Sequence, residues 1–156
     1  MSLNSIRFRF RQPLRAPAKL AYEWCTDFRP SDGRLFPQQW RRQVRRLSED
    51  ALILTDTTWP SGRRRVIQRL VRLNPQELSW TNTHLSGPFR HSQYWYRIVP
   101  DRGGRCHLDF AGLRLVRTAK PLSTAARTRL TEDERRGDST LWRDRIGPAL
   151  ERELAK

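Results

Sequence analysis

The strongest constraint on the fold is a run of short β-type segments between Trp40 and Arg117, separated by turn clusters at fairly even intervals. The segments are rich in Val, Ile, Leu, Thr, Trp and Tyr, residues that favour strands. They predict six strands, over about 40–47, 51–58, 64–73, 77–85, 90–99 and 105–116. Because the connections are short and carry no helical pattern, we expect an antiparallel meander and exclude a parallel βαβ sheet.

A further strand and a short helical region precede this run. Apolar and Arg residues alternate from Ile6 to Arg11, which predicts a half-buried strand with a solvent-exposed Arg face. We expect Pro13 to end that strand. Pro17 and the helical spacing of the apolar residues after it predict an amphipathic helix over about 17–28, and Pro37 limits any second helix to a turn or two.

The C-terminal region is helical again. An Ala-, Arg- and Glu-rich stretch follows Pro121, and a convincing apolar face begins only at Trp142. Pro148 lacks an amide donor and crowds the preceding turn, so we expect a bend there. Whether residues 118–140 form one continuous helix stays open.

The order of elements is therefore one strand, one or two short helices, six strands and a long helix. One long helix cannot cover both faces of a seven-stranded sheet, so the economical arrangement curls the sheet around it. We expect a single α+β domain of the helix-grip kind over residues 1–156, with Arg side chains on the convex face.

Several phrases, together with this order, resemble the START / polyketide-cyclase / SRPBCC superfamily, which has the helix-grip fold. They are the segments 14–24, 26–28, 94–100 and 103–108. The resemblance implies a cavity between sheet and C-terminal helix that holds lipids, polyketides, sterols or quinone-like molecules. That superfamily includes carriers, cyclases and dehydratases, and a chaperone-activating branch. It has no common catalytic set, so the fold alone assigns no reaction.

Aromatic and apolar side chains on the predicted inner faces are the candidate lining of that cavity. Their alternative role is ordinary core packing, whereas in a pocket wall the Tyr and Trp polar groups would orient a ligand. The candidate ligand-binding residues are Trp80, Tyr94, Tyr96, Phe110, Trp142 and Ile146.

The titratable residues give no catalytic or metal-binding motif. The three histidines are spaced 7 and 16 residues apart, unlike any compact metal site, so we expect neither metal nor cofactor. His84 and His91 could meet across a hairpin turn, but rim histidines without a special role are the simpler interpretation. We expect Asp109 to pair with an Arg on the outer face rather than to act as a base. Cys25 and Cys106 are expected to be buried thiols of a reducing compartment, here the cytoplasm.

The formal net charge is +15, and all but three of the 31 basic side chains are Arg. A solvated outer face is the simpler interpretation of the Arg runs, and a weak, non-specific platform for phosphates of nucleic acid or anionic lipid is the sharper one. The candidate polyanion contacts are Arg41, Arg42, Arg45, Arg46, Arg63, Arg64 and Arg65.

Three functions follow in order of preference. We expect a binder or carrier of a hydrophobic small molecule rather than an enzyme. A cyclase or dehydratase using the same cavity is the alternative, and a basic adaptor using the outer Arg face is the third. No stretch is long and apolar enough to span a membrane.

Overall fold

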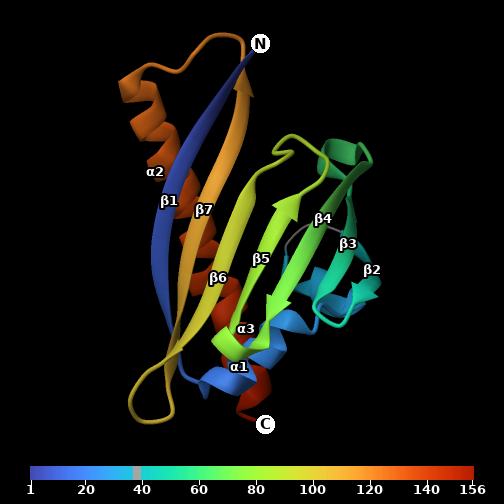
Figure 1. The fold of residues 1–156 in the computed structure, drawn as a ribbon, viewed down its shortest axis with the longest axis vertical. Helices are drawn as coiled ribbons and strands as arrows, with labels where there is room; N and C mark the ends of the chain where they lie inside the picture. The colour runs from blue at the N-terminus through green and yellow to red at the C-terminus, as the bar shows by residue number, and fades with distance from the viewer. Residues whose placement is uncertain (37–39) are drawn as a thin grey trace.

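The computed structural model describes residues 1–36 and 40–156. A seven-stranded antiparallel sheet lies in front of a long C-terminal helical segment in Figure 1. The strands run in the order β1-β7-β6-β5-β4-β3-β2 across the sheet. Their bounds are β1 (Ser2–Leu14), β2 (Trp40–Ser48), β3 (Ala51–Thr58), β4 (Arg65–Asn74), β5 (Ser79–His84), β6 (Gln93–Pro100) and β7 (Cys106–Thr118).

The helices frame this sheet. Helix α1 (Ala18–Thr26) and the 3-10 helix η1 (Pro30–Leu35) follow β1, and two short 3-10 turns, η2 (Pro60–Gly62) and η3 (Pro75–Glu77), join strands. The C-terminal segment consists of α2 (Thr124–Leu141), the π-helical turn η4 (Trp142–Ile146) and α3 (Gly147–Leu154). The predicted α+β helix-grip architecture is confirmed, with all six strands of the meander present. Pro37 lies outside the described residues. None of the described helices is long and apolar enough to cross a membrane.

The prediction that Pro13 ends the first strand is wrong. β1 continues to Leu14, and Pro13 lies opposite His107 of β7. Proline cannot donate a hydrogen bond to a neighbouring strand, but β1 is the edge of the sheet and needs donors on one side only. The edge position, which the local sequence does not reveal, makes this proline compatible with the strand.

Helix α1 begins at Ala18, with Pro17 in the N-cap position, and ends at Thr26, two residues before Phe28. The backbone of Phe28 adopts a positive φ of 45°, which no α-helical residue has, so the chain turns there. The turn buries the Phe28 side chain and starts the connection to η1.

The C-terminal helix is interrupted, as expected, just before Pro148. The N–H of Gly147 donates to the carbonyl of Trp142, one residue further back than in an α-helix. This wider turn accommodates the proline, which has no N–H of its own. Earlier in the segment α2 is continuous, and the Ser123 hydroxyl caps its start by accepting from the N–H of Ala126 at 3.1 Å.

The core lies between the concave face of the sheet and the helices. Alternate residues of the central strands point inward, among them Ile98, Leu108 and Leu54, each at most 1% exposed. Gly112 of β7 belongs to the same face, and a Cβ atom there would lie 3.1 Å from the ring of Phe8. The glycine therefore leaves room for the aromatic layer that continues into the cavity.

Candidate functional site

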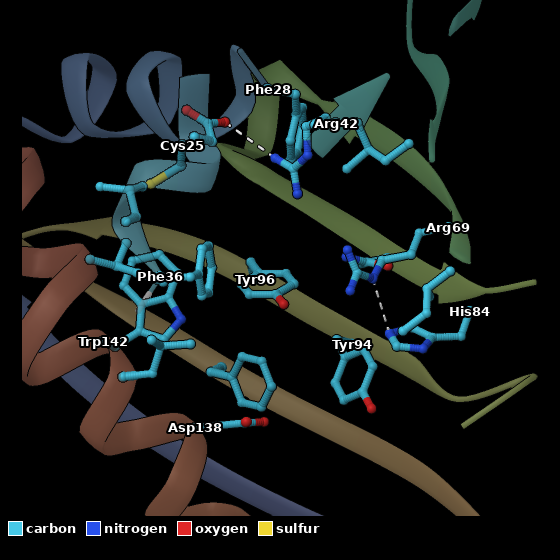
Figure 2. A pocket seen from close by; sticks show the side chains of 18 of the residues that line it. Cys25, Phe28, Phe36, Arg42, Arg69, His84, Tyr94, Tyr96, Asp138 and Trp142 are labelled. Atoms are coloured by element: carbon cyan, nitrogen blue, oxygen red, sulfur yellow. Dashed lines mark hydrogen bonds and ion pairs between the residues drawn. The ribbon is translucent and has the colours of Figure 1, made fainter. Parts of the chain in front are cut away.

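A cavity of about 360 Å³ lies between the concave face and the elements α1, η1, α2 and η4. Figure 2 shows side chains from both sides converging on it. Its volume is at the small end of the range for pockets that bind small molecules. Its apolar lining is Trp24, Phe28, Leu35, Phe36, Leu54, Ile67, Phe89, Phe110, Leu141, Trp142 and Ile146. Its lining with polar groups is Cys25, Asp32, Trp40, Arg42, Arg69, Asn82, His84, Tyr94, Tyr96, Arg114 and Asp138.

Five of the six candidate ligand-binding residues line this cavity: Tyr94, Tyr96, Phe110, Trp142 and Ile146. Trp80 does not. It is buried one layer behind the wall, where its ring stacks on Tyr96 at 4.8 Å and 2°. That the five residues contact a ligand stays a prediction.

Strand register builds the aromatic side of the cavity. Tyr96 lies opposite Phe110 on β7, and the two rings meet edge to face at 5.1 Å. The ring of Trp142 on η4 approaches Tyr96 from the helix side at 6.3 Å. Offset and edge-to-face contacts of this kind fix ring orientations. The sheet and the C-terminal segment therefore together form an aromatic wall of packed rings.

A buried ion cluster forms the opposite side. Asp56 of β3 is 1% exposed and lies opposite Arg42 of β2, whose Nε and Nη2 donate to its two oxygens at 2.7 and 2.9 Å. Arg69 of β4 pairs with the same carboxylate. Arg42 also donates to Asp32 of η1 at 3.2 Å and covers the ring of Trp40 at 4.8 Å. One carboxylate thus holds two guanidinium groups at the cavity wall.

His84 extends this cluster as a neutral imidazole. Its Nε2 accepts from Nε of Arg69 at 3.3 Å, so in the neutral ring the proton is on Nδ1. Burial, reinforced by the charges of Arg69 and Arg114, lowers the pKa of His84 to about 3. Among the described residues its Nδ1 and the Nε1 of Trp40 are buried without a hydrogen-bond partner. Both are therefore donors that protein groups leave unused.

A second ion cluster joins Arg114 of β7 to two carboxylates of α2, Glu134 and Asp138. Nε of Arg114 donates to the Tyr94 hydroxyl at 2.8 Å, and its Nη2 donates to Asp138 at 3.1 Å. Glu134 also pairs with Arg114. Burial raises the pKa of the Asp138 carboxyl, although the charge of Arg114 opposes the shift. This cluster joins the sheet to α2 at the cavity.

The hydroxyl of Tyr96 points into the middle of the cavity in Figure 2. No hydrogen bond from it to another described residue is present, unlike the hydroxyl of Tyr94. Burial, together with the charge of Asp138, raises its pKa well above 10. The group therefore stays protonated and acts as a donor.

The prediction that Arg42 belongs to an exposed polyanion platform is wrong, because 8% of its side chain is exposed and it faces the cavity. The other six predicted platform residues are exposed: Arg41, Arg45, Arg46, Arg63, Arg64 and Arg65. Arg42, Arg69, Asp56 and Asp138 were not among the predicted ligand-binding residues. The alternation of side chains along a strand could have indicated Asp56, because it points to the same face as the buried Leu52 and Leu54.

The remaining candidates lie elsewhere. His91 is exposed, and only its backbone meets His84, through an N–H to carbonyl bond of 2.8 Å. Asp109 pairs with Arg11 at 3.1 Å on the outer face, as predicted. Both cysteines are free thiols; Cys106 is buried, as expected, whereas Cys25 is only partly buried and lines the cavity. Within residues 1–36 and 40–156, no group of three or more His, Cys, Asp or Glu side chains is arranged to hold a metal ion.

No family model and no curated protein matches the sequence. Solved structures do. The Zhui aromatase/cyclase from Streptomyces sp. R1128 superposes with a TM-score of 0.74 at 15% identity, over 97% of this chain and 94% of the other. Norcoclaurine synthase from Thalictrum flavum gives 0.70 at 12% identity, over 98% of both chains.

A third structure, the di-domain aromatase/cyclase StfQ from the steffimycin biosynthetic pathway, gives 0.68 at 13% identity over 97% of this chain and 49% of its own. Identities this low establish a common fold, not a common activity. The chain therefore has the same helix-grip fold as these structures, which is the fold that the resemblance in its sequence implied.

Proposed function

We propose that this protein binds or carries a neutral, oxygen-bearing aromatic small molecule, of phenolic, quinone-like or polyketide-like type, in the cavity. The observation that carries the proposal is the division of the cavity into an aromatic wall and a facing set of hydrogen-bond donors. An aromatic ligand would lie against Phe110 and Trp142. Its carbonyl or hydroxyl oxygens would face Arg69 and His84.

The unused donors support an oxygen-bearing ligand. The Trp40 and His84 ring N–H groups are buried without a partner among the described residues, and the Tyr96 hydroxyl points into the cavity. A buried donor without a partner costs about 1–3 kcal/mol, a cost that a ligand oxygen would remove. A purely aliphatic ligand would leave these donors unpaired.

The charges support a neutral ligand over an anionic one. The three guanidinium groups at the cavity belong to Arg42, Arg69 and Arg114. The carboxylates in contact with them are Asp32, Asp56, Glu134 and Asp138. Because the positive charge is already compensated, an incoming carboxylate would lose its hydration without gaining an unpaired cation.

Binding is favoured over catalysis because the cavity offers donors but few proton acceptors. A pKa of about 3 makes His84 a poor base near neutral pH, and Tyr96 keeps its proton. Two carboxyl groups on the wall, those of Asp32 and Asp138, have a raised pKa, and each accepts a hydrogen bond from an arginine, Asp32 from Arg42 and Asp138 from Arg114.

Isothermal titration calorimetry with matched ligands tests the proposal. We expect 2-acetyl-1-naphthol to bind at least about tenfold more tightly than 2-ethylnaphthalene, since one or more hydrogen bonds distinguish them. Dodecanoate and 1-naphthoate should bind more weakly still. Tyr22→Phe is the control for variants of the wall, because Tyr22 is buried but does not line the cavity. Equal affinity for the two neutral naphthalenes, or tightest binding of dodecanoate, contradicts the proposal.

The second candidate, a cyclase, rests on Asp138. Its carboxylate would remove a proton from a carbon beside a ligand carbonyl, and the enolate carbon would attack a second carbonyl of the same ligand. Tyr96 would protonate the new alkoxide and regain its proton from Asp138 through solvent. A short poly-β-ketone thioester assayed for an aromatic chromophore tests this. Activity that persists in Asp138→Asn excludes this base, and no activity in the unaltered protein leaves the binding function alone.

A further inference from the structure

The outer face of the sheet carries an exposed tryptophan at its centre. Trp95 of β6 is 42% exposed, and its ring packs on no aromatic or guanidinium group of the described residues. The residues directly beside it on the neighbouring strands are Ala111 of β7 and Thr81 of β5. Because both are small, the face of the indole is open to a planar partner.

Unpaired arginines flank this tryptophan on both sides. The register places Arg9 of β1 beside Ala111, and Arg72 of β4 beside Thr81. One transverse row therefore reads Arg9, Ala111, Trp95, Thr81, Arg72, and neighbouring strands about 4.8 Å apart put each Arg about 10 Å from Trp95 along the sheet.

Arg7 extends the same face along β1. Arg7, Arg9 and Arg72 are exposed, and no ion pair to another described residue is present for any of them. By contrast, Arg11 and Arg97 are partly neutralised by Asp109 and Glu77. A shallow groove runs along this face between Arg9 and Trp95. Figure 1 shows that the outer face of the strands β1, β7, β6 and β5 points away from α2.

We propose that this face binds single-stranded nucleic acid, with a base stacked on Trp95 and phosphates on Arg7, Arg9 and Arg72. This function is separate from the cavity and does not depend on it. Exposed aromatic rings flanked by cations are the elements of sequence-tolerant single-strand binding, since every base has a π-face and every nucleotide a charge.

Three other occupants fit this face less well. A DNA duplex keeps its bases stacked inside and offers nothing to Trp95. A lipid surface calls for several inserted apolar side chains, whereas Trp95 is the large apolar residue exposed at the centre of the described face. A second copy of the chain would bring arginine against arginine.

Fluorescence anisotropy with a short fluorescein-labelled oligothymidylate tests the proposal. The three phosphate contacts predict a slope of log affinity against log salt of about −2, or about a 20-fold loss between 50 and 200 mM salt. Trp95→Ala should weaken binding about 5- to 150-fold without changing that slope, and Trp95→Phe should retain most of the affinity. The joint variant Arg9→Ala/Arg72→Ala should reduce the slope by about 1.4.

The matched control is Arg63→Ala/Arg64→Ala, which removes the same charge from the exposed β3–β4 connection. It should affect affinity less than Arg9→Ala/Arg72→Ala does. No binding at 50 mM salt, equal binding of a duplex, or an unchanged affinity in Trp95→Ala each overturns the proposal. Binding to phosphatidylglycerol vesicles without binding to the oligonucleotide overturns it in favour of a lipid surface. Circular dichroism of each variant verifies that the fold is intact.

Discussion

Replacing Asp56 by Asn should strongly destabilise the protein. The Asp56 side chain is 2% exposed and accepts hydrogen bonds from both Arg42 and Arg69. The substitution keeps the size of the side chain but leaves two mostly buried guanidinium groups facing a neutral amide. Removing one partner of a buried ion pair costs about 3–5 kcal/mol. For a chain of 156 residues, this corresponds to a fall in Tm of about 9–15 °C.

Urea unfolding followed by tryptophan fluorescence, with thermal unfolding followed by circular dichroism, measures the effect. Asp109→Asn is the matched control. It also removes a carboxylate from a strand, but the Asp109 side chain is 44% exposed and pairs with a single Arg. Screening by solvent limits its cost to about 0–1 kcal/mol. If Asp56→Asn costs no more than Asp109→Asn, the buried cluster does not stabilise the fold as described.

Three further predictions concern the cavity and its rim. Tyr96→Phe should weaken binding of 2-acetyl-1-naphthol about tenfold in calorimetry, by the loss of one hydrogen bond, and leave Tm nearly unchanged; an unchanged affinity would remove Tyr96 from the binding site. His84 has a folded pKa of about 3 against an ordinary 6.5, so the stability from its neutral ring is complete above pH 6.5 and is lost as the pH falls toward 3. The free energy of unfolding from urea titrations should fall more steeply with acidification than in His84→Gln, by up to about 1.4 kcal/mol per pH unit, and parallel curves would contradict this. Glu153→Ala should speed amide exchange in η1, measured by mass spectrometry, because Glu153 joins α3 to Trp24 at 2.7 Å and to Arg29 at 3.1 Å. Unchanged exchange would show that η1 does not rely on these contacts.

The sheet was predictable from the sequence because turn residues bound each strand locally. The segment 51–58 lies between an acidic turn and Pro60, and β3 has those same bounds. Pro13 was misread because its effect depends on which strand lies at the sheet edge, a tertiary property.

The site was predictable in its aromatic half only. Alternation places Tyr96 and Phe110 inward, whereas Arg42 and Arg69 stand in basic runs that indicate a solvated surface. Their burial depends on Asp56, whose register with Arg42 is set by pairing of two strands. Asp138 likewise faces the cavity from a helix that buries none of its own residues fully, so its composition indicates solvent.

A crystal structure of the protein grown with 2-acetyl-1-naphthol tests the central claim most directly. We predict the ligand rings against Phe110 and Trp142, with a ligand oxygen within hydrogen-bond distance of Arg69, His84 or the Tyr96 hydroxyl. A cavity closed by its own side chains, or a ligand bound only on the outer surface of the sheet, would contradict the account.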